Sequence, residues 1–351
     1  MRFEDKKLYE ESPDVANRYR KNFKEGLERF IETLNTSGKQ ERTAFFPPEA
    51  LPEKIEEYRS KYRDMLGIPR VPDGIFGAVE KTYVATDDVC DIFRVAIGIT
   101  EEIPMYGLLL MPKQAKEPMP LVIAQHGGGG TPELCSDFHG ENNYNHMVQR
   151  ALSRGAAVFA PQLLLWNIGE KSATCPHYEP PYSREVINTN LVRFGLSVAG
   201  IQIAGISKAI DYLCTLPEID GKKIGMIGLS YGGYFTLYTM AADTRIRAGY
   251  ACACFNDRDA YPWQDMVFPN SGRMFQDAEV AALCAPRKLY VSIGKEDEVF
   301  TYQTGIPEAE RVKPYFAAMG AEENFVFDVH SGGHTVKPTD EGYDFLFEAL
   351  K

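Results

Sequence analysis

The sequence predicts an α/β protein with a mostly parallel central sheet of about eight strands, helices on both faces of the sheet, and an N-terminal helical extension. Two observations predict this class. From residue 79 onward β-rich runs appear, and from residue 120 they alternate with helical segments. Most of these runs are continuously apolar, as in strands that are buried on both faces. We therefore divide the chain into a helical extension, residues 1–75, and a main domain, residues 76–351.

The extension carries two amphipathic helical patterns, at residues 12–34 and 52–66. Ser12 followed by Pro13 is typical of a helix start, and Gly67 is typical of a helix end. Within each pattern, apolar side chains recur at three- and four-residue steps and form one stripe. Since such stripes usually bury against a core, we expect the extension to pack on the main domain. A subunit interface or a lid over a binding pocket is the alternative.

The main domain opens with three β-rich runs, at residues 79–89, 90–99 and 105–112, whose short turns predict an antiparallel sheet edge. Further strands are predicted at residues 120–125, 156–162, 222–229, 247–255, 287–294 and 323–330. Helices are predicted at residues 145–155, 196–217 and 338–350, and directly after residue 230. One segment, residues 163–193, fits neither pattern. It is too long for an ordinary strand-to-helix loop, so we expect a long insertion near the functional site.

Composition argues against several classes of partner. Asp and Glu outnumber Lys and Arg by 49 to 38, a formal net charge of −11, and an acidic surface repels nucleic acid and anionic membranes. The first residues lack a signal-peptide pattern, and no apolar run is long enough to span a membrane. The seven cysteines are scattered and mostly lie in apolar runs, so we expect reduced thiols in a cytoplasmic protein.

The motif with the most chemical content is the G-x-S-x-G at residues 228–232, between an apolar strand and a helix. Glycines two residues on either side of Ser230 permit a tight turn that presents its hydroxyl as a nucleophile. The backbone N–H of Tyr231 then lies at the helix N-terminus, where it can bind a developing oxyanion. A glycine-rich turn with a capping serine is the alternative that involves no chemistry.

A second glycine-rich stretch, His126 to Gly130, follows the strand at 120–125. Its exposed backbone N–H groups suit the second oxyanion donor, which we assign to Gly128, with Gly127 as the nearest rival. His126 is expected to shape this loop by hydrogen bonding and not to transfer protons. The stretch lacks the G-K-[ST] ending of a phosphate-binding loop and the G-x-G-x-x-G spacing of a dinucleotide site.

Together with two later stretches, these motifs resemble those of serine α/β-hydrolases, in the branch that is similar to dienelactone hydrolases and acetylxylan esterases. The later stretches are Ala285-Pro286-Arg287 leading to Gly294 and Asp297, and Gly332-Gly333-His334. The likeness covers about residues 75–350 and implies an α/β-hydrolase fold with a Ser, Asp, His triad. True dienelactone hydrolases use a cysteine nucleophile, whereas this chain has Ser230.

The resemblance places the triad acid at Asp297, a few residues after the strand at 287–294. Two other carboxylates stay open as alternatives, because triad roles are decided by geometry and not by sequence position. Glu296 is adjacent to Asp297, and Asp257 follows the preceding strand.

Two histidines four residues apart, His330 and His334, are candidates for the base. His330 ends the strand at 323–330, whereas His334 lies on the glycine-containing loop beyond it and can turn back toward Ser230. We therefore assign the base to His334. A zinc-binding pair is disfavoured, because two glycines oppose the helix that would align both rings and no third ligand is evident.

These residues predict a serine esterase that needs no cofactor and no metal. Ser230 attacks a small-molecule ester, His334 moves the proton, and Asp297 orients His334. Trp166 and Gly127 are expected to contact the substrate, a short-chain ester or an acetylated carbohydrate. A serine peptidase of the prolyl-peptidase type and a non-catalytic binding protein on the same scaffold are the alternatives. The sequence leaves the oligomeric state open, homo-oligomers included.

Overall fold

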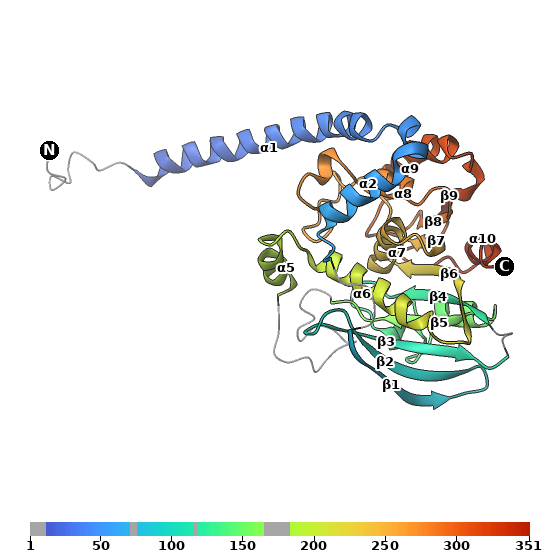
Figure 1. The fold of residues 1–351 in the computed structure, drawn as a ribbon. Coiled ribbons are helices and arrows are strands. Elements are labelled where there is room, and N and C mark those ends of the chain that lie inside the picture. The colour runs from blue at the N-terminus through green and yellow to red at the C-terminus, as the bar shows by residue number, and fades with distance from the viewer. Residues whose placement is uncertain (1–11, 71–75, 115–117, 165–182) are drawn as a thin grey trace, which may run out of the picture.

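A single sheet organises the chain (Figure 1). The computed structural model describes residues 12–70, 76–114, 118–164 and 183–351. Trp166, which was expected to contact substrate, lies outside these ranges, as does most of the insertion predicted at residues 163–193.

The sheet has nine strands within the described residues, one more than the predicted eight or so, in the order β1-β2-β3-β5-β4-β6-β7-β8-β9. The strands are β1 (Phe76–Thr86), β2 (Cys90–Gly98), β3 (Pro104–Pro112), β4 (Met119–Gln125), β5 (Ala157–Pro161), β6 (Ile219–Leu229), β7 (Ile246–Cys252), β8 (Lys288–Gly294) and β9 (Phe325–His330). The first three are antiparallel, as predicted, and β3 also pairs antiparallel with β5. Every pairing from β5 to β9 is parallel. The predicted α/β-hydrolase fold class is therefore confirmed.

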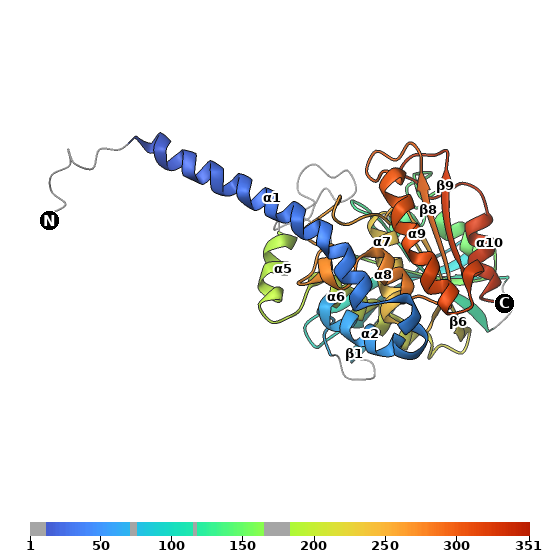
Figure 2. The ribbon, with the colours of Figure 1, turned by 90° about the horizontal axis from the view of Figure 1, so that it is seen from above.

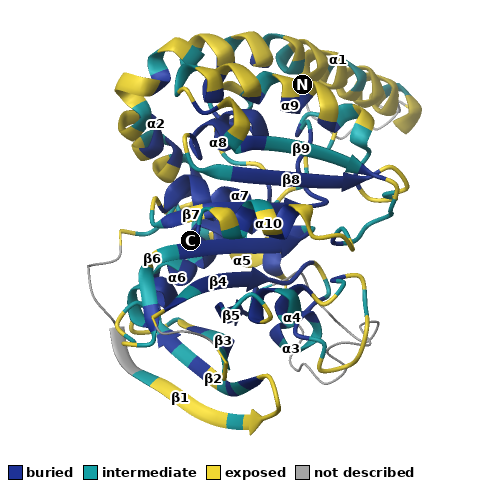
Figure 3. Cartoon of the chain, turned by 90° about the vertical axis from the view of Figure 1, so that its right-hand side faces the viewer, coloured by how far each residue is buried: buried dark blue, intermediate teal, exposed yellow. Residues whose placement is uncertain are grey.

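Helices cover both faces of this sheet (Figure 3). The described helices are α1 (Pro13–Phe45), α2 (Leu51–Leu66), α3 (Pro132–Cys135), α4 (Met147–Leu152), α5 (Arg184–Val192), α6 (Val198–Leu213), α7 (Tyr231–Ala242), α8 (Asp277–Ala282), α9 (Tyr302–Ala318) and α10 (Glu341–Glu348). Side chains of α2, α6, α7, α8 and α9 share one hydrophobic core with one face of the sheet. Those of α3, α4 and α10 share a second core with the other face.

Strand β4 shows how one strand serves both cores. Leu121 and Ile123 belong to the first core, and Val122 belongs to the second. Successive side chains of a strand point to opposite faces, so a strand buried on both faces has to be apolar throughout. This is the physical basis of the continuous apolar runs in the sequence.

Helix α1 differs from its predicted extent and packing. The predicted helix ends at residue 34, where a run of Asn, Thr, Ser and Gly lowers helix propensity, yet α1 continues to Phe45. Tertiary contacts stabilise the added turns, since the buried Arg42 guanidinium donates to the Gly272 carbonyl at 2.7 Å. The N-terminal half instead projects from the body of the molecule (Figures 1 and 2), and its apolar stripe is exposed.

Helix α9 was not predicted. It contains Pro307 and Pro314, and proline removes a backbone donor from a helix, so the local sequence argues against this element. Its inner side nevertheless buries Val312 and Phe316 in the first core. No helix among the described residues is both long and apolar enough to cross a membrane.

Candidate active site

Ser230 occupies the turn between β6 and α7, with backbone angles φ 59° and ψ −117°. A positive φ is unfavourable for a residue with a side chain, so the surrounding structure has to stabilise this conformation. The Ser230 N–H donates to the carbonyl of Cys252 at the end of β7, at 2.8 Å. The turn is thus held against the carboxyl edge of the sheet, where the strand direction places the nucleophile.

The two glycines of the motif are required by close backbone contacts. A Cβ added at Gly228 would lie 2.3 Å from the backbone of Gly232, and one added at Gly232 would lie 2.0 Å from the carbonyl oxygen of Gln125. Neither distance leaves room for a side chain. The steric reason given for the G-x-S-x-G pattern therefore applies to this chain.

The second glycine-rich stretch lies directly beside Ser230. A Cβ added at Gly127 would be 3.2 Å from the Cβ of Ser230. The Gly127 N–H already donates to the hydroxyl of Tyr144, at 2.8 Å. Gly128 is exposed, and no hydrogen bond to its N–H is found within the described part of the chain. Between the two rivals for the oxyanion donor, this geometry favours Gly128.

His126 is fully buried and stabilises this loop. Its Nδ1 lies 2.9 Å from the Gly127 carbonyl, and its Nε2 accepts the N–H of Leu163, just beyond β5. These contacts require a neutral ring with the proton on Nδ1. Burial lowers the pKa of His126 to about 4, which keeps the ring neutral. As expected, its hydrogen bonds connect two loops and leave no nitrogen for proton transfer.

His334 and Asp297 form a hydrogen-bonded pair across the loops that follow β9 and β8. His334 Nδ1 lies 3.0 Å and 2.9 Å from the two carboxylate oxygens of Asp297. The Asp297 side chain is inaccessible to solvent, whereas 22% of the His334 side chain is exposed. With a proton on Nδ1, His334 keeps an Nε2 lone pair that can accept a proton from a nucleophile.

The Asp297 carboxylate is stabilised in its charged form. Burial alone would raise its pKa, but the hydrogen bonds from His334 and from the backbone N–H groups of Phe300 and Val299 outweigh burial and lower the pKa. An ionised carboxylate at this position favours a histidine whose Nδ1 is protonated.

The two alternative acids lie elsewhere. Asp257 forms an ion pair with Lys39 of α1 at 2.5 Å and also accepts the N–H of Asp259. The Glu296 side chain is exposed, and its backbone N–H donates to Gly332. Of the three candidates, Asp297 is the one whose carboxylate is hydrogen-bonded to His334.

His330 is the last residue of β9 and has a different environment from His334. It is buried, and its Nδ1 accepts the N–H of Gly332 at 3.0 Å. Burial lowers its pKa. No cluster of three or more metal-ligating side chains occurs among the described residues.

A loop after α3 connects the histidine to the nucleophile. Asn143 donates to the carbonyl of His334 at 3.1 Å, and the next residue, Tyr144, holds Gly127 against Ser230. No hydrogen bond joins the Ser230 hydroxyl to His330 or His334 in the described ranges. Catalytic hydrogen bonds are often long before substrate binds.

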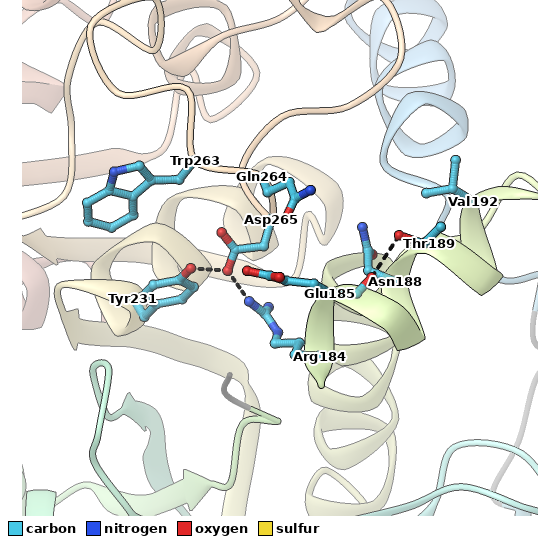
Figure 4. Close-up of a pocket in the computed structure, with 9 residues that line it drawn as sticks. All are labelled: Arg184, Glu185, Asn188, Thr189, Val192, Tyr231, Trp263, Gln264 and Asp265. Carbon is cyan, nitrogen blue, oxygen red and sulfur yellow. Dashed lines mark hydrogen bonds and ion pairs between the residues drawn. The ribbon is translucent and has the colours of Figure 1, made fainter. Parts of the chain in front are cut away.

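A cavity of about 460 Å³ adjoins Tyr231, the residue after the nucleophile (Figure 4). It is lined by residues of α5, by Tyr231, and by Trp263, Gln264 and Asp265. The Tyr231 hydroxyl and the Arg184 guanidinium both donate to the same oxygen of Asp265. Burial raises the pKa of Tyr231, and the Asp265 carboxylate raises it further, so the hydroxyl keeps its proton.

Several residues of this site had no signal in the sequence. Tyr144, Asp265 and Arg184 lie in loops or in a short helix without a recognisable motif, and their roles depend on partners distant in the chain. Trp263 lies in the loop after β7.

The chain is similar in sequence to known hydrolases. The sequence profile of the dienelactone hydrolase family matches residues 105–332. A Bacillus subtilis protein named as the hydrolase YtaP is 24% identical over 250 residues, which are 67% of this chain and 78% of that protein.

Solved structures share the fold. One described as an acetyl xylan esterase from Bacteroides fragilis has a TM-score of 0.63 at 15% identity, over 87% of this chain and 84% of that one. A glucuronoyl esterase from Solibacter usitatus has a TM-score of 0.62 at 16% identity, over 86% of this chain and 93% of that one.

Proposed function

The chain belongs to the dienelactone hydrolase family, and from this premise we propose that it is a serine esterase that cleaves small carboxylic esters, with acetylated carbohydrates as the favoured class. The observation that carries the proposal is the solvent-inaccessible Asp297 paired with His334, on the same carboxyl edge of the sheet as a serine on a tight strand-to-helix turn. This arrangement supports nucleophilic acyl transfer. The names of the structural relatives, acetyl xylan esterases and glucuronoyl esterases, support a carbohydrate ester as the substrate.

In the proposed mechanism, Ser230 attacks the ester carbonyl while His334 Nε2 takes its proton. Asp297 orients the imidazole and stabilises its cationic form. His334 then donates the proton to the leaving alcohol, and water hydrolyses the acyl-enzyme by the same steps. No step calls on a cofactor.

The oxyanion of each tetrahedral intermediate is bound by the backbone N–H groups of Tyr231 and Gly128. Tyr231 is the first residue of α7, so its N–H lies at the positive end of the helix dipole. Gly128 is the residue after Gly127, whose own N–H donates to the Tyr144 hydroxyl. Both glycines lie in the loop that packs on Ser230. We therefore propose that Gly127 contacts the substrate because it lies beside Ser230, and that its N–H is not the oxyanion donor.

A substrate panel tests the proposal. We expect the purified chain to hydrolyse 4-nitrophenyl acetate and acetylated methyl glycosides, and not an alanyl-prolyl anilide. Faster release from the anilide would favour a peptidase. Absence of turnover on every ester, together with no labelling of Ser230 by a fluorophosphonate, would favour a binding protein.

A cytoplasmic location is part of the proposal. The six cysteines within the described ranges are free thiols. Free thiols are typical of proteins in reducing compartments.

We also propose that the chain self-associates through the projecting half of α1. Its exposed stripe, Tyr19, Phe23, Leu27, Phe30 and Ile31, reaches 71% exposure at Tyr19, and large exposed apolar patches usually mark an interface. Residues 18–24 carry four cationic side chains and no acid, whereas residues 25–32 carry three acids and one Arg. An antiparallel pair with a second copy places each basic half beside an acidic half.

Light scattering after size-exclusion chromatography tests this pairing. We expect a dimer for the unmodified chain and a monomer for Phe23→Asp, because a carboxylate on the stripe would be desolvated. Thr33→Asp adds the same charge off the stripe, next to the acidic half, and should leave the dimer intact. A monomeric unmodified chain at high concentration, or a dimer that survives Phe23→Asp, would contradict the proposal.

A further inference from the structure

The cavity beside Tyr231, the residue after the proposed nucleophile, has an aromatic side and a polar side (Figure 4). On the aromatic side, the rings of Tyr231 and Trp263 are nearly parallel, at 20°, with centroids 6.3 Å apart. The hydrogen bond from the Tyr231 hydroxyl to Asp265 holds the first of these rings in place. Such a surface suits the apolar C–H face of a ring-shaped ligand.

The polar side is one face of α5. Glu185, Asn188, Thr189 and Val192 line the cavity at the three- and four-residue steps that share a helix face. Asn188 Oδ1 accepts the N–H of Val198 at 3.0 Å, which leaves its Nδ2 as a donor. The Thr189 hydroxyl donates to the Glu185 backbone carbonyl at 2.8 Å, so toward a ligand it can only accept. The face therefore offers a carboxylate and a hydroxyl oxygen as acceptors, and an amide as a donor, to the hydroxyl groups of a ligand.

The charge of the cavity lining is negative. Arg184 supplies one positive charge, and Glu185 and Asp265 supply two negative charges. The Arg184 guanidinium is paired with Asp265, and its side chain is only 3% exposed. Within the described residues no salt bridge neutralises Glu185. A ligand carboxylate in this cavity would meet Glu185 with no unpaired cation among the described lining residues to balance it.

We propose that this cavity binds the neutral sugar of an O-acetylated glycoside and discriminates against a sugar that carries a free carboxylate. The proposal rests on the proposed esterase function and adds the substrate class to it. The aromatic pair covers the ring, the α5 face hydrogen-bonds its hydroxyls, and Glu185 repels a uronate. Glu185 is thus a specificity-determining residue.

Two substrates that differ at one carbon test this inference: acetylated methyl glucoside and acetylated methyl glucuronoside. We expect kcat/KM to favour the neutral glucoside by roughly fivefold, mostly through KM, because Glu185 is exposed and its field is partly screened. Glu185→Gln should remove most of this preference. The preference should also shrink as the salt concentration rises.

Asn190→Lys is the matched control, since it makes the same change of one positive charge on α5 but does not line the cavity. It should preserve the preference. If 4-nitrophenyl acetate is hydrolysed but the glucuronoside is used as well as the glucoside, the inference is wrong and the esterase function stands. The inference also fails if Glu185→Gln leaves the preference unchanged. Failure to hydrolyse 4-nitrophenyl acetate at all would overturn the esterase function instead.

Discussion

Ser230→Ala is expected to lower kcat for 4-nitrophenyl acetate by about 10⁵-fold, because no acyl-enzyme can form without the hydroxyl. Residual turnover above the uncatalysed rate would come from the oxyanion donors and from substrate binding. Steady-state kinetics measures the effect. A thermal melt near that of the unmodified chain would show that the variant is folded.

Ser153→Ala provides the control for this change. Ser153 is exposed after α4, and its hydroxyl donates to the carbonyl of Arg150. Its removal should leave kcat unchanged. If Ser230→Ala retained kcat within about tenfold, another nucleophile would carry the reaction and the proposed mechanism would be wrong.

Asp297→Asn is expected to lower kcat by about 10⁴-fold. An amide at this position can donate to Nδ1, which would favour the tautomer that has its proton on Nε2 and cannot take a proton from Ser230. It also removes the negative charge that stabilises the cationic imidazole. The substitution preserves shape, so KM should change much less than kcat.

Asp257→Asn tests the rival acid with the same chemical change. Its carboxylate pairs with Lys39, whose side chain is 45% exposed, and surface ion pairs of this kind contribute at most about 1 kcal/mol to stability. We expect nearly unchanged kcat and a small fall in melting temperature. A large loss of kcat in Asp257→Asn with a small loss in Asp297→Asn would transfer the acid role to Asp257.

Where prediction from the sequence succeeded, the information was local. A strand buried on both faces has to be apolar at every position, so β4, β6, β7 and β8 were recognisable from their own residues. The G-x-S-x-G motif was recognisable because Gly228 packs against the backbone of Gly232 too closely for any side chain. Where prediction failed, tertiary contacts outweighed local preference, as in the final turns of α1, which the buried Arg42 stabilises, and in the proline-containing α9.

The sequence by itself determined the α/β class, the order of the candidate nucleophile, acid and base, and the glycines that make their loops compact. It preferred Asp297 to Asp257 and Gly128 to Gly127 but left both rivals open, because the contacts of each residue in space are not written in its local sequence. Tertiary structure decided that Asp297 meets His334 and that Tyr144 occupies the Gly127 N–H. It also brought Arg184, Tyr231 and Asp265 together from three separate segments. A motif records contacts between neighbours in the chain, whereas a binding surface is made of contacts between distant segments, whose partners the local sequence does not specify.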